Sequence, residues 1–292
     1  MPIEITPGIR LLRANNPSPL TERGTNTYLI GAADGTGPVA VIDPGPDDDD
    51  HLEAILTAAP QISHILLTHP HLDHSALIPK LKARSGAPTY AFGVWSDGRS
   101  AVMQDLAARG LAGGGEGLDR GFIPDHRLAD GDKVSGPGWE LTALHTPGHS
   151  APHLAFLTGQ HLLCGDLAMG WSSTLISPPD GDLGSYMNSL ARLKNLGPVV
   201  LLPGHGDAVA EGQARLSWLA EHRATRAEQI RAALANESQV IPALAALLYA
   251  ETPHHLHPAA ERNIFAHLIE MHEKSLIFAD PELSPTAKFA LR

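Results

Sequence analysis

The chain has 292 residues, of which 43% are hydrophobic and 18% are charged, as in folded globular proteins rather than disordered ones. Its net charge of -11 excludes a broad basic surface for nucleic acid or anionic lipid. The single cysteine, Cys164, excludes an intrachain disulfide and suits a reducing compartment. We find no signal-like N-terminus and no apolar run near the ~20 residues of a membrane span, so we expect a cytoplasmic protein.

The first 205 residues predict strands that alternate with helices. Runs rich in β-branched and aromatic residues, bounded by glycine and proline, indicate strands, and amphipathic stretches between them indicate helices. The expected strands cover residues 25–30, 39–43, 64–68, 139–144, 153–157, 161–164 and 199–202, and the expected helices cover 48–58, 72–85 and 183–196. This order favours a layered α/β domain with helices packed outside sheets.

Residues 95–132 are the least regular stretch of this part. Their glycine-rich run, residues 113–117, lacks the Gly-Lys-Ser/Thr ending of a phosphate-binding loop. We therefore interpret the run as a simple connection between elements.

The composition changes after Gly206, where alanine, leucine, glutamate and arginine dominate. We expect helices over residues 211–234, 241–249 and 258–274, and a short strand over 276–278. Three helices followed by a strand are the outline of a small winged-helix domain. We therefore divide the chain into a catalytic domain, residues 1–208, and a helical, winged-helix-like domain, residues 209–292.

Four possible metal ligands lie close together in the run His69-Pro70-His71-Leu72-Asp73-His74, where an apolar strand is expected to end and a helix to begin. His69 and His71 are two residues apart, so they lie on one side of an extended segment. Asp73 and His74 follow at the helix start and can reach a neighbouring point. The run therefore predicts a site for two metal ions rather than one.

Three further possible ligands, His149, Asp166 and His205, each follow an apolar strand, and a glycine directly precedes each of them. Glycine allows the backbone to approach closely or to take a positive φ. Imidazole and carboxylate ligands without a thiolate in the main cluster suit Zn²⁺, Mn²⁺ or iron. A single histidine at a strand end is more often an ordinary hydrogen-bonded residue, but seven such residues in order favour a metal site.

The series His69-x-His71-x-Asp73-His74, followed by His149, Asp166 and His205, resembles the ligands of the metallo-β-lactamase superfamily. This resemblance implies an αββα sandwich with two divalent metal ions, most often zinc, at one edge. It assigns His69, His71 and His149 to the first ion, Asp73, His74 and His205 to the second, and Asp166 to a bridging position between them.

Segments outside the ligands resemble the branch of that superfamily that contains the β-lactamase-like protein 2 endoribonucleases, which is related to glyoxalase II. They are residues 25–28, 41–45, 173–174, 186–190, 203–206 and, in the helical tail, 249–257. The sequence departs from many relatives after His149, where Ser150-Ala151-Pro152 stands in place of acidic residues before His153. This departure bears on substrate contacts near His153 rather than on the metal ligands.

The ligand set predicts a metal-dependent hydrolase. Two cations about 3.5–4 Å apart lower the pKa of a shared water towards ~7, and the bridging hydroxide attacks an ester, thioester, lactone or phosphodiester. Asp73 is the candidate catalytic residue, as acceptor of the water's proton, and Asp43 is either a partner of the ligand loop or an ordinary turn residue. Candidates for the pocket mouth are Ser172, Ser173, Thr174 and Tyr186.

The substrate is left open between a small ester or thioester and single-stranded RNA. Residues 206–292 carry eight Lys/Arg and eleven Asp/Glu, whereas a nucleic-acid-binding winged helix usually has a basic face. Arg223, Arg226 and Arg231 are the candidates for a local basic face. We expect the tail first to pack or to support a homodimer, and second to clamp RNA. The alternative from another class is a winged-helix binding protein whose hydrolase-like domain is inactive.

Overall fold

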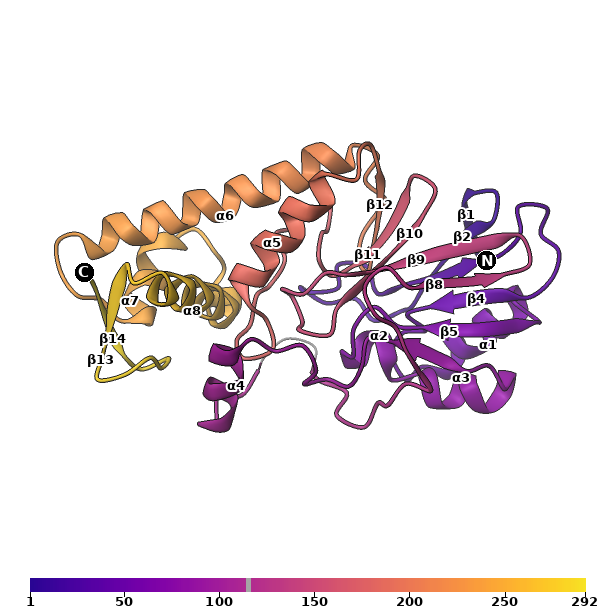
Figure 1. Ribbon diagram of the computed structural model, residues 1–292, viewed down its shortest axis with the longest axis horizontal. Coiled ribbons are helices and arrows are strands. Elements are labelled where there is room, and N and C mark those ends of the chain that lie inside the picture. Colours follow the sequence, from indigo (N-terminus) through magenta and orange to yellow (C-terminus); the bar gives the residue numbers. More distant parts are fainter. Residues whose placement is uncertain (114–116) are drawn as a thin grey trace.

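The computed structural model describes residues 1–113 and 117–292, so most of the glycine-rich run lies outside the described residues. Two sheets pack face to face at one end of the molecule, and the C-terminal helices gather at the other end (Figure 1). The first sheet has the order β1 (Ile3–Thr6), β2 (Ile9–Arg13), β3 (Asn26–Ile30), β4 (Val39–Ile42), β5 (Ile62–Leu66), β6 (Thr89–Ala91) and β7 (His126–Arg127). The second has the order β12 (Val200–Pro203), β11 (His161–Gly165), β10 (Leu154–Thr158), β9 (Trp139–His145) and β8 (Lys133–Gly136).

Alternating side chains of the strands fill the space between the two sheets and the space under the helices. In β4, Ala40 and Ile42 face the core between the sheets, whereas Val39 and Val41 face the helices that cover the first sheet. A strand that is buried on both faces needs apolar residues at every position, which is why Val39–Ile42 has no polar residue. The layers are therefore helix, sheet, sheet and helix, as predicted.

The helices of the first layer are α1 (Asp49–Ala58), α2 (Leu72–Ser75) and α3 (Ile78–Ser85). The Asp48 carboxylate caps α1 by accepting hydrogen bonds from the amides of Asp50 and His51. The single helix expected over 72–85 is wrong, because it is broken into α2 and α3. Pro79, in the first turn of α3, has no N–H to donate to the carbonyl four residues earlier, so an unbroken helix could not pass through it.

The C-terminal part contains α6 (Gly212–Leu234), α7 (Ile241–Leu248), a 3₁₀ turn (His254–Leu256), α8 (His257–Glu273) and the antiparallel strands β13 (Ile277–Asp280) and β14 (Lys288–Leu291). The last strand was not expected. Helix α4 (Ala101–Ala108), which was also not expected, packs its Met103 and Leu106 into the same core. Among the described residues, no helix is long and apolar enough to cross a membrane.

Helix α6 joins the two parts because each of its halves lies in a different core. Leu216 and Leu219 pack with α5 (Leu183–Lys194) and the outer face of the second sheet, whereas Ile230 and Leu234 pack with α7 and α8. The boundary between two domains at residues 208 and 209 stays a prediction. In the structure, the two parts share one long helix.

We predict that Asp125 stabilises the fold in a pH-dependent way. Its carboxylate accepts hydrogen bonds from Lys82 and from the amide and hydroxyl of Thr89 at 2.6–2.8 Å, and these contacts lower its pKa to about 2. Because this pKa is below the unfolded value of ~3.9, the stabilisation is present above pH ~4 and is lost as the pH falls towards 2. The Asp125→Asn variant should lose about 1 kcal/mol at pH 7, after allowance for solvent screening.

The measurement is urea unfolding of both proteins at pH 7, 4 and 2.5, where the difference between their midpoints should shrink. Asp105→Asn is the control, because among the described residues the side chain of Asp105 on α4 has one ion pair, an exposed one with Arg109, and should matter little. A constant difference at all three pH values would contradict the assignment to Asp125.

Candidate metal centre

The seven candidate ligands all follow the carboxyl ends of strands. His69 to His74 come after β5 of the first sheet, and His149, Asp166 and His205 come after β9, β11 and β12 of the second. Because the two sheets pack face to face, their strand ends meet at one edge. All seven side chains are buried, and the structure brings them together in three overlapping groups whose possible ligand atoms lie within 4.8 Å of one another.

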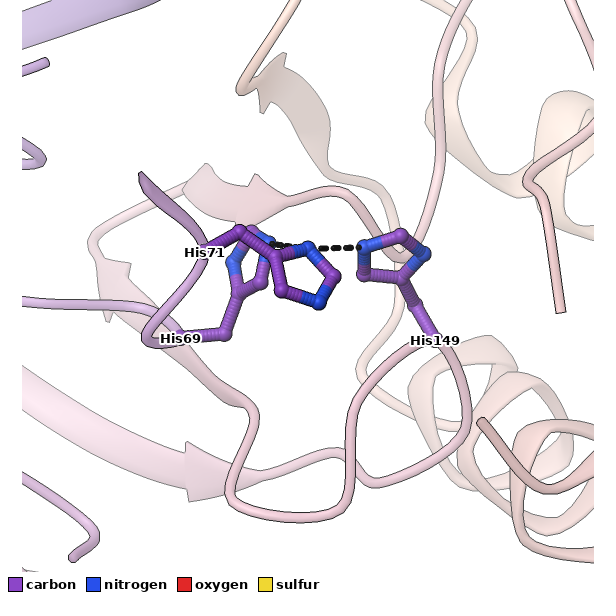
Figure 2. A group of neighbouring side chains, drawn as sticks. All are labelled: His69, His71 and His149. Carbon is purple, nitrogen blue, oxygen red and sulfur yellow. Dashed lines mark hydrogen bonds between the residues drawn. The ribbon is translucent and has the colours of Figure 1, made fainter. Parts of the chain in front are cut away.

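The first group joins His69, His71 and His149 (Figure 2). His69 Nε2 lies 3.0 Å from His71 Nδ1, and His149 Nε2 lies 3.1 Å from the same nitrogen. Two of these residues come from the loop after β5 and one from the loop after β9, so the group bridges the two sheets. Three imidazole nitrogens that converge in this way can bind one ion from three sides.

The second group joins Asp73, His74 and His205. His205 Nε2 lies 3.3 Å from His74 Nε2 and 3.2 Å from Asp73 Oδ2. Asp166 lies between the two groups, with Oδ2 at 3.3 Å from His205 Nε2 and 3.7 Å from His149 Nε2. A carboxylate in this position reaches both groups.

The polar atoms at this edge fit the binding of cations. Asp73 Oδ1 and Oδ2 and Asp166 Oδ1 are buried and accept no hydrogen bond of ordinary geometry from the described residues. Buried carboxylate oxygens without a partner are costly unless a cation compensates them. A Cβ on Gly204 would lie 2.3 Å from Asp166 Oδ1 and 2.7 Å from His74 Cε1, so glycine is needed for the strand end to approach the ligands.

Asp43 is a hydrogen-bond partner of the loop that carries the candidate ligands, which is one of its two expected roles; the other was an ordinary turn residue. Its Oδ2 lies 3.0 Å from His74 Nδ1 and accepts a 2.7 Å hydrogen bond from the Thr68 hydroxyl, and its Oδ1 accepts from the Thr68 amide at 2.8 Å. A carboxylate on the far nitrogen of a histidine fixes its tautomer and leaves Nε2 free to bind a metal.

Asp180 plays the same part for His71 and was missed by the sequence analysis. Its Oδ2 lies 2.7 Å from His71 Nε2, and both side chains are buried. His149 Nδ1 lies 2.9 Å from the carbonyl oxygen of Leu175 in the same loop. Asp180 follows two prolines in a stretch without periodicity, and a backbone carbonyl is not visible in a sequence at all, so no residue pattern could have indicated either partner.

Burial and neighbouring charges set the protonation of these groups. Burial lowers the pKa of His149 to about 4 and that of His69 well below its usual value, so both imidazoles are neutral at pH 7 and offer lone pairs. Burial also opposes charge on His74, but the Asp73 and Asp166 carboxylates raise its pKa well above the usual value. Burial raises the pKa of Cys164 to about 12, so this thiol stays protonated and inert.

A cavity of about 230 Å³ opens onto the candidate ligands. His71, His149, Asp166 and His205 form its floor. Most of its other walls are apolar and come both from loops of the first part and from the C-terminal helices; they include Leu20, Met169, Trp171, Leu175, Tyr249, Leu256, Ala259 and Ala260. None of the described residues that line the cavity is a lysine or an arginine.

Ser172 and Ser173 line this cavity as expected, whereas Thr174 and Tyr186 are fully buried beneath it. The expectation of a basic face on α6 is wrong. Arg223 is buried, Arg226 donates to the Leu248 carbonyl and lies over the Tyr249 ring, and Arg231 pairs with Glu228. Arg223 and Arg226 connect α6 to α8 and α7, so these two are not free for phosphate groups, whereas the Arg231 pair lies within α6.

Comparison with known proteins places the chain in a family. A model described as the metallo-beta-lactamase superfamily matches residues 20–205. The chain belongs to this superfamily. A second model, the beta-lactamase associated winged helix domain, matches residues 241–280. The predicted αββα fold with a C-terminal winged helix is thereby confirmed.

Relatives extend over most of the chain. It is 28% identical over 279 residues to a beta-lactamase-like protein 2 homolog of Drosophila melanogaster, covering 91% of this chain and 88% of that protein. It is 28% identical over 241 residues to an atrochrysone carboxyl ACP thioesterase of Aspergillus chevalieri, covering 80% and 68%. The crystal structure of a beta-lactamase domain protein from Burkholderia ambifaria has the same fold, with a TM-score of 0.82 at 24% identity and coverage of 100% and 93%. The chain is a hydrolase of the superfamily.

We predict that the Gly204→Ala substitution lowers the metal content of the purified protein. The added Cβ would meet Asp166 and His74, and one of them must move. Elemental analysis should find fewer metal ions per chain than in the original protein. Gly121→Ala is the matched control, because the nearest atom to its added Cβ lies at 3.6 Å. Equal metal content in both variants would show that this close approach does not shape a metal site.

Proposed function

We propose that this protein is a binuclear metal-dependent hydrolase that cleaves a small, uncharged ester or thioester. His69, His71 and His149 would hold one ion, Asp73, His74 and His205 would hold a second, and Asp166 would serve both. The observation that carries the proposal is the mostly apolar cavity whose described lining has no lysine or arginine and includes four of these seven residues, His71, His149, Asp166 and His205. Zinc suits the donor set, and manganese or iron are the alternatives.

Two bound divalent ions would supply an activated water and a positive field for the oxygen that gains charge during hydrolysis. The residues of the chain orient these parts. Asp43 and Asp180 hold His74 and His71 at their far nitrogens, so the near nitrogens stay directed at the site. Asp73 would accept the proton of the attacking water, because its two carboxylate oxygens are buried and accept no hydrogen bond of ordinary geometry from the described residues.

The lining of the cavity favours an acyl substrate over RNA. A phosphodiester chain needs cationic groups along its path, whereas the described walls are mostly apolar side chains. The volume of about 230 Å³ lies below the ~300–1,000 Å³ of pockets for drug-sized ligands. One relative is named as an acyl-carrier-protein thioesterase, which supports thioesters as the first class to test.

The function is tested by a panel of acyl thioesters, esters, lactones, β-lactams and single-stranded RNA. We expect metal-dependent cleavage of thioesters or esters with apolar acyl groups and no cleavage of RNA above background. Chelation should abolish the activity, and added Zn²⁺ or Mn²⁺ should restore it. The His71→Ala variant serves as control for contaminating hydrolases.

Preferential cleavage of RNA would overturn the substrate assignment but leave the hydrolase intact. A protein that carries no metal after purification without chelator, and that cleaves none of these compounds, would favour the binding-protein alternative. The two parts of the proposal are therefore tested separately.

The role of Asp73 predicts that Asp73→Asn lowers kcat about 10²–10⁴-fold when both ions are still bound. The substitution keeps the shape of the side chain and removes the oxygen that takes the proton. The measurement is kcat at saturating metal, with metal content determined in the same sample. Unchanged turnover in the fully loaded variant would eliminate Asp73 as the proton acceptor.

A further inference from the structure

The loop of residues 174–180 holds two of the candidate ligands of the first ion. The carbonyl oxygen of Leu175 lies 2.9 Å from His149 Nδ1, and the carboxylate of Asp180 lies 2.7 Å from His71 Nε2. Each contact fixes the nitrogen that faces away from the site. The orientation of both rings therefore depends on where this loop lies.

The loop is held in turn by the C-terminal helices. The Ile176 amide donates a 3.0 Å hydrogen bond to Asn263 Oδ1 on α8. The Leu175 carbonyl and the Ile176 amide belong to the same peptide group, which is planar and rigid. One peptide group thus connects His149 on one side with Asn263 on the other, and a shift of Asn263 would be passed to the imidazole.

Arg223 of α6 fixes Asn263. Its Nη1 donates to Asn263 Oδ1 at 3.2 Å, and its Nη2 donates to the Thr174 carbonyl in the same loop. The arginine is 2% exposed, and no carboxylate among the described residues pairs with it. Burying an unpaired guanidinium is costly, and its buried hydrogen bonds to the loop and to Asn263, with the Tyr186 ring beside it, compensate this charge.

The orientation of the Asn263 amide follows from its partners. The Ile176 amide and the Arg223 guanidinium are donors only, so the side-chain oxygen must face them. Aspartate at this position would keep an acceptor oxygen and add a charge that Arg223 can balance, whereas alanine would leave both donors without a partner. Comparing Asn263→Asp with Asn263→Ala therefore tests whether the acceptor oxygen at this position is what matters.

We propose that Asn263 of the winged-helix domain is a positioning residue of the metal centre, which acts on His149 through the Leu175–Ile176 peptide group. This inference rests on the proposed role of His69, His71 and His149 as ligands. The winged-helix domain then determines how tightly the first ion is held, although it contributes no ligand to it.

The test is a titration of the metal-free full chain with Co²⁺, followed by visible absorption, for the original protein, Asn263→Ala and Asn263→Asp. We expect Asn263→Ala to bind one of two ions about 10-fold more weakly, in line with the loss of a partner behind a metal ligand, and to change the absorption bands of that ion. Asn263→Asp should restore both the affinity and the bands.

Ile264→Val is the control for general destabilisation, because Ile264 is fully buried in the C-terminal core. It should lower the thermal midpoint and leave both Co²⁺ affinities unchanged. Unchanged affinities in Asn263→Ala, an equal loss in Ile264→Val, or no recovery in Asn263→Asp would each overturn the inference while the proposed function stands. Failure of the original protein to bind Co²⁺ would overturn the proposed function itself.

Discussion

Two carboxylates and five imidazoles are buried against one another at one edge of the molecule, and this concentration of polar groups away from water is the constraint on which the rest of the structure depends. Asp73 and Asp166 have buried oxygens that accept no hydrogen bond of ordinary geometry from the described residues, although imidazole nitrogens lie 3.2–3.5 Å away. Buried carboxylates of this kind need compensation for their charge. Two cations would supply that compensation. The outer partners Asp43 and Asp180 lie behind His74 and His71 and fix the orientation of these imidazoles.

The sandwich explains how residues 136 positions apart, His69 and His205, come to face one point. The side chains between the sheets, such as Ile42 of β4 and Phe156 of β10, fix the distance and angle between the two layers. Each sheet ends at the same edge, so ligands placed directly after strands are carried to the site by the core packing. A ligand on a long loop would lose this precision, and the close approach of Gly204 to Asp166 shows how little room is left.

The sequence was sufficient for the features that local pattern determines. Strand alternation, the glycine before each candidate ligand and the order of histidines and aspartates all depend on neighbours in the chain, and the structure places these residues as expected. The partners that depend on tertiary contacts were out of reach. The Leu175 carbonyl and Asp180 lie in an irregular stretch, and α4 is short and packs against a core formed by residues far along the chain. The expected basic face on α6 was wrong because the spacing of arginines along a helix does not distinguish a buried guanidinium from a solvated one.

The winged-helix domain is built into the hydrolase rather than attached to it. The preceding helix α6 contributes Leu216 to the core under the second sheet and Ile230 to the C-terminal core. Helix α8 contributes Ala260 and Asn263 to the wall of the cavity, and Asn263 also binds the loop behind His149. An arginine that is buried to hold this loop is not available to a nucleic-acid backbone. The contacts of α8 therefore favour a C-terminal part that shapes the apolar cavity. The burial of Arg223 speaks against a basic surface on α6 that would bind RNA.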